Sequence, residues 1–236
     1  LGALRRSREA QTQLVQDAGH ELRTPLTSLR TNISLLRRID ELPPETRAQV
    51  LADLDEEAKE LSVLVDELVE LATDQRRPEA VTSVDLGALA EAVADRVRRR
   101  TGREIVVAVT EPAVVEGRPG ALDRAVGNLV DNALRHTPAG GTVTVGTRAA
   151  EHGVALVVED SGSGIAPEHL PHVLERFYRA DPGRDRGRGG SGIGLAIVRA
   201  LVDAHGGTVR VDSPGVGRGT TATVTLPAAS GVSRRP

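Results

Sequence analysis

Residues 19–30 read GHELRTPLTSLR and lie within a long amphipathic segment of the chain. From residue 14 to residue 36, apolar residues recur at alternating steps of three and four, which predicts one packed face of an α-helix. This face consists of Val15, Ala18, Leu22, Leu26, Leu29, Ile33 and Leu36. The pattern resumes after Pro44, on a second face that consists of Leu51, Leu54, Ala58, Leu61, Val65, Leu68 and Ala72. The two stretches predict a helical hairpin over residues 1–73.

A hairpin of two helices buries only part of its apolar faces, because each helix has a single partner. Dimerisation into a four-helix bundle is the simplest way to bury the remainder. We therefore expect a homodimer that forms through residues 1–73.

His20 lies on the polar side of the first predicted helix. It precedes Leu22 by two residues, so at about 100° per residue its side chain points roughly 200° away from the packed face. Thr24 shares that side, and Pro25 cannot donate a hydrogen bond to the carbonyl of Glu21, which loosens the helix beside the histidine. An imidazole with a pKa of about 6.5 is mostly neutral in cytosol and can act as a nucleophile. Taken alone, such a histidine is also typical of an exposed polar residue beside a helix kink.

Residues 74–80 are polar and contain Pro78, which predicts a linker to a second domain over residues 81–228. Strand and helix patterns alternate there. Helices are expected over residues 86–100, 121–135 and 192–204. Strands are expected over residues 81–84, 105–109, 142–148, 154–159, 208–211 and 221–226. This order predicts a two-layer α/β sandwich, followed by a tail over residues 229–236.

One predicted helix of this domain carries a polar side with two amides. Asn128 and Asn132 lie one turn apart in GNLVDNALRHTP, residues 127–138, with Arg135 on the same side. The apolar stripe of the helix consists of Leu122, Val126, Leu129 and Ala133. Amide oxygens suit Mg²⁺, which is usually held by one or two side chains together with nucleotide phosphates. An asparagine pair alone is also typical of an ordinary helix surface.

Two glycine-containing stretches predict contacts with a ligand. Asp160 follows an apolar run, and Gly162 and Gly164 let the backbone turn closely around a flat group such as adenine. GGSGIG, residues 189–194, leads into a helix, whose free N–H groups attract phosphate. Each stretch is also typical of a simple turn. A dinucleotide-binding fold is disfavoured, because an arginine-rich loop at residues 183–189 replaces the strand that it requires.

The segment around His20 resembles the H-box of the histidine kinase dimerisation and phosphoacceptor domain. The His-Glu-x-x-Thr-Pro core of that motif is present in full. The resemblance implies that His20 accepts a phosphoryl group, that Glu21 assists it, and that Thr24 orients a water molecule in the reverse, phosphatase direction. A Glu21 carboxylate that accepts from Nδ1 would leave the Nε2 lone pair free to attack.

The second domain resembles the histidine kinase ATP-binding domain, which shares the GHKL (Bergerat) fold with gyrase and Hsp90 ATPases. Its N, G1 and G2 boxes match the three stretches above, and ERFYRAD at residues 175–181 matches the F box. The resemblance implies a mobile lid over residues 180–189, Mg²⁺ held by Asn128 and Asn132, and adenine held near Asp160. The implied nucleotide-binding residues are Asn128, Asn132, Arg135, His136, Asp160, Gly162, Gly164, Ile165, Phe177, Tyr178, Arg179, Gly190, Ser191, Gly192, Ile193, Gly194 and Leu195.

The two resemblances together imply a sensor histidine kinase core. We expect autophosphorylation of His20 by Mg-ATP, transfer to an aspartate of a response regulator receiver domain, and phosphatase activity toward that regulator. One alternative is a GHKL-type ATPase, but such enzymes place a water-activating glutamate where this chain has Asn128. Another alternative is a catalytically silent dimeric scaffold, which would tolerate damaged motifs.

Composition restricts the remaining classes of function. The 236 residues carry a formal net charge of −3, which disfavours nucleic acid as a partner, and they include no cysteine. No apolar run approaches the roughly 20 residues of a membrane span. We expect this fragment to be soluble, and to lie at the cytoplasmic face of the cell membrane as part of a longer protein.

Several charged and histidine residues have simpler interpretations. Arg96 and the run 98–100 are predicted to form a solvated helix end. His169 and His172 are spaced for one helix face but have no third metal ligand at a suitable spacing. His205 is predicted to favour the negative C-terminal end of the helix that precedes it.

Overall fold

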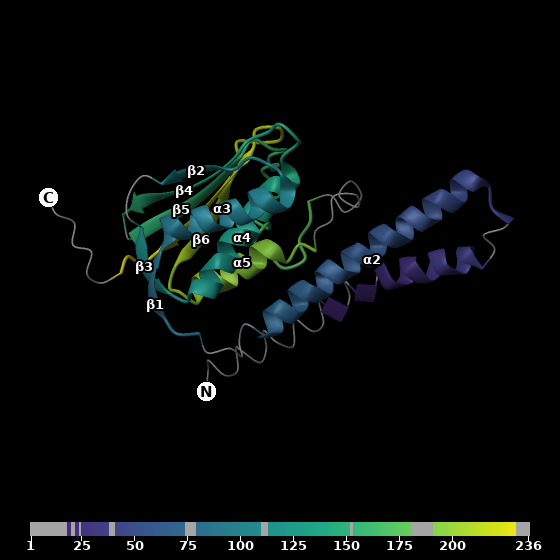
Figure 1. Cartoon of the computed structure of the whole chain (residues 1–236), viewed down its shortest axis with the longest axis horizontal. Helices are drawn as coiled ribbons and strands as arrows, with labels where there is room; N and C mark the ends of the chain where they lie inside the picture. Colours follow the sequence, from purple (N-terminus) through teal and green to yellow (C-terminus); the bar gives the residue numbers. More distant parts are fainter. Residues whose placement is uncertain are drawn as a thin grey trace. The chain divides into compact units, whose positions relative to one another are not determined.

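The computed structural model describes residues 18, 19, 22, 23, 25–37, 41–73, 79–109, 113–151, 153–180 and 191–229. The chain divides into two compact units. Residues up to Thr73 belong to the first unit, and residues 74–180 and 192–236 form the second. Figure 1 shows the helices of the first unit in purple and blue, and the α/β layers of the second in teal, green and yellow.

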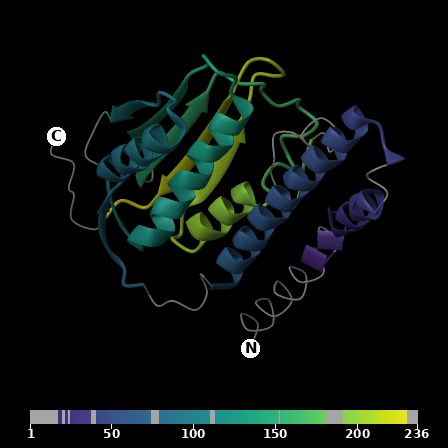
Figure 2. The same ribbon diagram turned by 45° about the vertical axis from the view of Figure 1, so that its right-hand side comes forward.

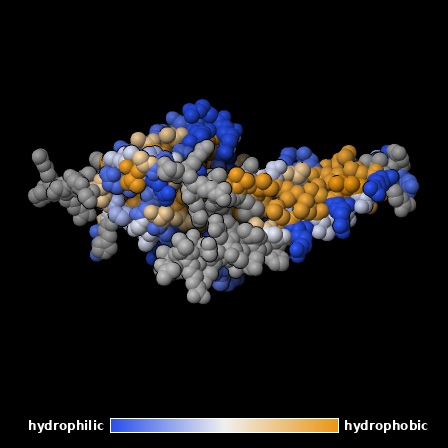
Figure 3. All heavy atoms as spheres, turned by 90° about the horizontal axis from the view of Figure 1, so that it is seen from below, coloured by the Kyte–Doolittle hydropathy of each residue, from blue (hydrophilic) through white to orange (hydrophobic). Residues whose placement is uncertain are grey.

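The first unit is helical, as predicted. Helical residues 25–36 lie beside helix α2 (Pro44–Thr73), and the Ser28 hydroxyl donates to Oε2 of Glu57 at 3.1 Å. In α2, the side chains of Val50 and Leu64 are buried at 5% exposure each. Side chains of the predicted faces remain exposed in the single chain: Leu26, Ile33, Leu51 and Val65, between 45% and 54%. Figure 3 shows hydrophobic side chains gathered along this hairpin.

The second unit is a two-layer α/β sandwich, which confirms the predicted fold class. A five-stranded sheet has the order β2-β4-β5-β7-β6, and a two-stranded sheet pairs β1 with β3. Helices α3, α4 and α5 lie on one face of the larger sheet, as Figures 1 and 2 show. In chain order the elements are β1 (Thr82–Asp85), α3 (Leu86–Thr101), β2 (Val106–Val109), β3 (Val114–Gly117), α4 (Pro119–His136), β4 (Val143–Ala150), β5 (Gly153–Asp160), α5 (Gly194–Asp203), β6 (Thr208–Asp212) and β7 (Thr220–Leu226).

The predicted helices and strands of this unit correspond to observed elements, with one omission. Strand β3 was not predicted, because only four residues form it and its partner β1 lies about thirty residues earlier in the chain. Helix α4 begins at Pro119, two residues earlier than predicted, because proline is favoured in the first turn of a helix. Helix α3 is capped by Asp85, whose side chain accepts from the N–H groups of Gly87 and Ala88.

The core lies between the larger sheet and the three helices. Its largest fully buried side chains are aliphatic, and burial of each stabilises the fold by about 1.5–3 kcal/mol. They include Leu86, Ile105, Leu122, Leu129, Leu156 and Ile193. The predicted apolar stripe of α4 is confirmed, since each of its four residues is at most 4% exposed. Burial of this stripe fixes which side of α4 faces away from the sheet.

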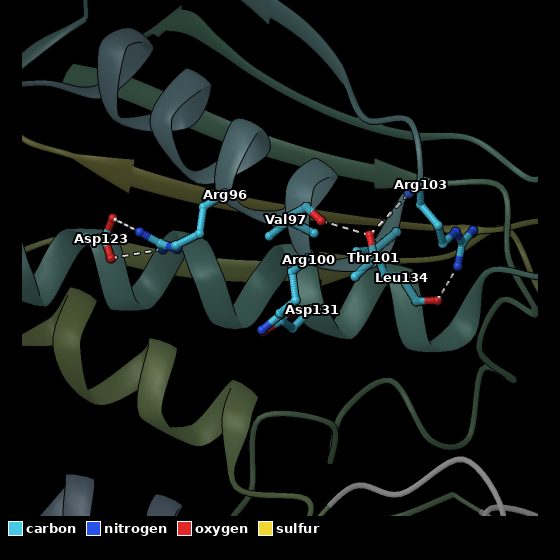
Figure 4. A network of polar contacts seen from close by, with 8 residues as sticks. All are labelled: Arg96, Val97, Arg100, Thr101, Arg103, Asp123, Asp131 and Leu134. Carbon is cyan, nitrogen blue, oxygen red and sulfur yellow. Dashed lines mark hydrogen bonds and ion pairs between the residues drawn. The ribbon is translucent and has the colours of Figure 1, made fainter.

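The prediction of a merely solvated end for α3 was wrong. Arg96 donates from both terminal nitrogens to the carboxylate of Asp123 on α4, at 3.0 Å each. Arg100 forms an ion pair with Asp131, one residue before Asn132. Figure 4 shows these side chains reaching from α3 to α4. The arginines therefore connect two helices, which a one-dimensional charge pattern cannot reveal.

Among the helices that the structure describes, none combines the length and apolar character that crossing a membrane requires.

Candidate functional site

Asp160 is the last residue of β5, the central strand of the larger sheet. Its Oδ1 atom accepts a hydrogen bond from the backbone N–H of Gly162 at 2.8 Å. Burial raises the pKa of the Asp160 carboxyl, while hydrogen bonds from Gly162 and Thr220 and the charge of His136 oppose that rise. Asp160 is thus a half-buried acceptor that is held in place at a turn.

Glycine is required at two positions after Asp160. A Cβ atom on Gly162 would lie 2.3 Å from the carbonyl oxygen of His136, at the end of α4. Gly164 has φ 62°, and a Cβ atom there would lie 2.1 Å from the carbonyl oxygen of Gly215. These close approaches bring three backbone segments together at Asp160, namely the β5 turn, the end of α4, and the β6–β7 connection.

The β6–β7 connection is fixed to this turn by hydrogen bonds. The Ser213 hydroxyl accepts from the N–H of Ile165 at 3.0 Å and donates to the carbonyl of Gly219 at 2.7 Å. Thr220 begins β7 directly opposite Asp160 in the β5–β7 register and hydrogen bonds to its carboxyl. Thr220 was missed by the sequence analysis; the glycine-rich turn before its strand was the available signal.

Helix α4 presents the predicted polar side beside this junction. Asn128, Asn132, Arg135 and His136 are all half-buried, opposite the buried stripe. The Nδ2 atom of Asn128 is buried and finds no hydrogen-bond partner among the residues that the structure describes. The carbonyl of His136 accepts from the N–H of Ser163 at 3.0 Å, which joins the end of α4 to the Asp160 turn. The four residues thus lie along α4 in the direction of the Asp160 turn.

The two aromatic residues lie before the segment 181–190, at the base of the predicted lid. The N–H of Phe177 donates to the carbonyl of Gly192 at 2.9 Å, and Phe177 has φ 60°, which is unusual for a side chain of its size. The Tyr178 hydroxyl lies 2.8 Å from Nδ1 of His169. Arg179 is half-buried. The hydrogen bond between Phe177 and Gly192 thus joins the residues that precede segment 181–190 to those that follow it.

Helix α5 starts at Gly194, two residues after the Gly192 carbonyl that Phe177 contacts. Gly192 has φ 71°, and no described side chain caps the helix at Ile193. Among the described residues, no atom lies within 4 Å of the place that a Cβ atom would take on Gly194. Ile193 is fully buried, whereas Ser191 and Leu195 are half-buried. The first turn of α5 therefore offers free N–H donors, which suit an anion.

Several predicted features lie outside the described residues. They are His20, Glu21, Thr24, Gly190, linker residues 74–78 and lid residues 181–189.

The remaining histidines have local partners. Residues 167–174 form turns rather than the helix face that was considered for His169 and His172, and Nδ1 of His172 lies 2.9 Å from Oε1 of Glu175. The prediction for His205 is confirmed, since its Nδ1 atom lies 2.6 Å from the carbonyl oxygen of Leu201 near the end of α5.

Family models match both units. Residues 10–77 match the His Kinase A (phospho-acceptor) domain, and residues 117–230 match the histidine kinase-, DNA gyrase B-, and HSP90-like ATPase domain. The second match identifies an ATP-binding domain.

Curated relatives are similar along nearly the whole chain. The signal transduction histidine-protein kinase/phosphatase MprB of Mycolicibacterium vanbaalenii is 43% identical over 96% of this chain and 48% of its own length. The protein of the same name from Mycolicibacterium smegmatis is 45% identical over 90% of this chain and 44% of its own. The chain thus spans about half the length of these relatives.

Solved structures support the same assignment. The mycobacterial sensor histidine kinase MprB is 40% identical, with a TM-score of 0.55 over 63% of this chain and 97% of that one. The Acinetobacter baumannii histidine kinase AdeS is 25% identical, with a TM-score of 0.63 over 89% of this chain and 98% of that one. The half-buried aspartate at a glycine-lined junction and the two amides on the adjoining helix agree with these similarities. The chain therefore belongs to the two-component sensor histidine kinases.

Proposed function

We propose that this chain is the catalytic portion of a sensor histidine kinase that transfers the γ-phosphoryl group of ATP to Nε2 of His20. The phosphoryl group then passes to an aspartate of a response regulator receiver domain. The observation that carries the proposal is the Asp160 junction, where a half-buried carboxylate lies between the end of α4 and the start of β7.

The adenine end of the site is assigned to Asp160, Gly162 and Gly164. An adenine amino group would donate to the Asp160 carboxylate, whose direction is set by the Gly162 N–H at 2.8 Å. Because the carboxylate is half-buried, a hydrogen bond to it is stronger than the same bond in open water. Half-buried Ile165 follows the junction and would supply apolar contact to the ring.

The phosphate end is assigned to α4 and the start of α5. Amide oxygens of Asn128 and Asn132 fit Mg²⁺, which prefers oxygen ligands. The Nδ2 atom of Asn128, which finds no partner among the described residues, is a donor that would suit a phosphate oxygen. Bound Mg²⁺ would neutralise phosphate charge. Arg135 and His136 would supply positive charge, and the free N–H groups at the first turn of α5 would donate to phosphate oxygens. The remaining proposed contacts come from Phe177, Tyr178, Arg179, Gly190, Ser191, Gly192, Ile193, Gly194 and Leu195.

The phosphoacceptor end is assigned to His20, Glu21 and Thr24. Glu21 would accept a hydrogen bond from Nδ1 of His20 and leave the Nε2 lone pair free to attack in line. In the reverse direction, Thr24 would orient a water molecule against a phosphorylated regulator, as the kinase/phosphatase names of the relatives suggest. Bringing His20 to the nucleotide requires a hinge, which we assign to linker residues 74–80.

The exposed apolar side chains of the first unit support a homodimer. Leu26 and Ile33 lie seven residues apart on one helix, and on α2 Leu51 and Val65 lie two heptads apart. These positions are 45–54% exposed in the single chain, so a second hairpin would bury them in a four-helix bundle. As part of the same proposal, the chain lies at the cytoplasmic face of the cell membrane within a longer protein.

ATP hydrolysis without transfer remains the competing activity. Position 128 favours transfer, because an asparagine there cannot remove a proton from water as a glutamate would.

The proposal is tested by incubating the chain with γ-labelled ATP and Mg²⁺. We expect protein-bound label in the wild type, and none in the Asp160→Asn variant. Steady phosphate release with no labelled protein would instead support the ATPase alternative.

A further inference from the structure

Arg103 connects the loop after α3 to the last turn of α4 (Figure 4). One terminal nitrogen donates to the carbonyl oxygens of Leu134 at 2.8 Å and Thr137 at 2.9 Å. The other donates to the carbonyl oxygen of Pro138 at 2.9 Å. A single guanidinium thus satisfies three backbone carbonyls at the C-terminus of α4.

These carbonyls need such a donor because of how α4 ends. The last carbonyls of a helix have no partner within the helix, and many helices satisfy them by a left-handed glycine. Helix α4 instead ends at Thr137 with φ −103° and ψ 125°, and the Thr137 N–H reaches Leu134 only at 3.4 Å. Arg103 therefore replaces the usual closing turn.

The position of Arg103 is itself fixed on the α3 side. Gly102 adopts φ 66° and donates its N–H to the carbonyl of Arg98, which ends α3. The Arg103 N–H donates to the Thr101 hydroxyl at 3.2 Å, and that hydroxyl donates to the carbonyl of Val97 at 2.8 Å. Since the backbone is already ordered, docking of the guanidinium costs side-chain entropy but no further backbone entropy.

The turn that Arg103 holds is also the wall of the nucleotide junction. The carbonyl of His136 accepts from the N–H of Ser163 at 3.0 Å and faces Gly162 so closely that no side chain fits there. Gly162 in turn donates to Asp160. Arg103 on one side and Asp160 on the other are therefore joined through one turn of backbone, residues 134–138.

We propose that Arg103 is a positioning residue for the nucleotide, which sets the end of α4 so that Asp160 and His136 meet the base and phosphates correctly. This inference rests on the proposed function, because it assigns a further residue to the same site. Arg103 would not touch the ligand; it acts through the carbonyls of residues 134–138. Loss of Arg103 would weaken ADP binding, and by more than loss of another contact between α3 and α4 does.

The same interface offers a matched control. Arg96 also links α3 to α4, but its two 3.0 Å hydrogen bonds go to the Asp123 side chain, far along α4 from the junction. A variant at Arg96 reports the general cost of weakening the contact between the two helices. Arg103→Lys keeps the charge but presents one ammonium group, which cannot match three carbonyls as a planar fork does.

The test compares wild type, Arg103→Gln, Arg103→Lys and Arg96→Gln in the full chain. Melting temperature and the dissociation constants of ADP and GDP are measured for each. We expect Arg103→Gln to weaken ADP binding about tenfold or more and to reduce the preference for ADP over GDP. Arg103→Lys should lie between Arg103→Gln and wild type, and Arg96→Gln should keep wild-type affinity and preference.

The outcomes separate this inference from the function on which it rests. A wild-type chain that does not bind ADP overturns both. If wild type binds ADP and Arg103→Gln keeps its affinity and preference, this inference alone is overturned. Equal losses of binding in Arg103→Gln and Arg96→Gln would also overturn it, because they would reduce Arg103 to a general contact. Should Arg103→Gln fail to fold, Arg103→Lys decides by the same criteria.

Discussion

The Nε2 atom of His205 accepts a hydrogen bond from the backbone N–H of Arg118 at 3.0 Å, while its Nδ1 atom lies 2.6 Å from the carbonyl oxygen of Leu201. A carbonyl oxygen only accepts, so Nδ1 carries the proton and Nε2 the lone pair. The ring is thus neutral and held in one tautomer. His205 joins the end of α5 to the start of α4, and these are the two helices that flank the proposed phosphate site.

Replacement of His205 by phenylalanine should remove both hydrogen bonds and keep an apolar ring. We expect the free energy of unfolding to fall by about 1–3 kcal/mol, because the Arg118 N–H and the Leu201 carbonyl lose a partner. Denaturant unfolding measures the change. His172→Phe is the control, since His172 is exposed and contacts Glu175 at the surface. Equal stability of the two variants would contradict the bridging role.

Gly162→Ala should damage the nucleotide junction. The added Cβ atom would lie 2.3 Å from a backbone oxygen that cannot move away without displacing the end of α4. We expect a loss of stability of about 1–3 kcal/mol and weaker ADP binding, measured by denaturant unfolding and by titration. Gly127→Ala, in the middle of α4, is the matched control.

At Gly127 the nearest contact of an added Cβ atom is an Arg96 nitrogen at 3.7 Å, an ordinary separation. Because alanine favours a helix over glycine, this variant should gain up to about 1 kcal/mol. If Gly162→Ala were as stable as Gly127→Ala, the close packing at the junction would be disproved.

These positions illustrate what the sequence can predict. The stripe and polar side of α4 follow from periodicity within one helix, so Asn128 and Asn132 could be placed without knowledge of the fold. Thr220 could not, because its position depends on a strand register that joins it to Asp160, sixty residues away. Arg103 was missed for a similar reason, since its three partners lie 31 to 35 residues away, at the end of the next helix and just beyond it. Local patterns predicted the elements, whereas contacts between distant segments needed the structure.

The Asp160 carboxyl should make stability depend on pH. Burial raises its pKa above the ordinary value of 3.8. A raised pKa means that the folded state binds the proton more tightly than the unfolded chain does. The contribution of this group to stability is therefore greatest below the ordinary value and is lost as pH rises toward and beyond the raised value.

Asp160→Asn carries no ionisable group at this position, so its stability should rise relative to wild type as pH increases from about 3 to 7. Urea unfolding at a series of pH values measures the difference. The variant should also lose ADP binding by about tenfold or more, because the amide offers a donor where an acceptor is needed. A fall in the stability of Asp160→Asn relative to wild type as pH rises would show that the pKa is lowered instead.

A charge within the exposed apolar stripe should prevent dimerisation. We expect Val65→Glu, at a position that is 45% exposed in the single chain, to sediment as a monomer at concentrations where wild type is a dimer. Burial of an unpaired carboxylate in a four-helix bundle is strongly unfavourable. Lys59→Gln is the control on the same helix, because the side chain of Lys59 is exposed and pairs with exposed Asp55. A dimeric Val65→Glu variant would place the interface elsewhere.

The central claim is that His20 receives the phosphoryl group, and mapping the labelled residue after incubation with γ-labelled ATP and Mg²⁺ tests it most directly. We predict acid-labile, alkali-stable label on the peptide that contains His20, in wild type and in the control His172→Gln. The His20→Gln variant should bind ATP as wild type does and acquire no label. Equal labelling of His20→Gln and wild type would contradict the account.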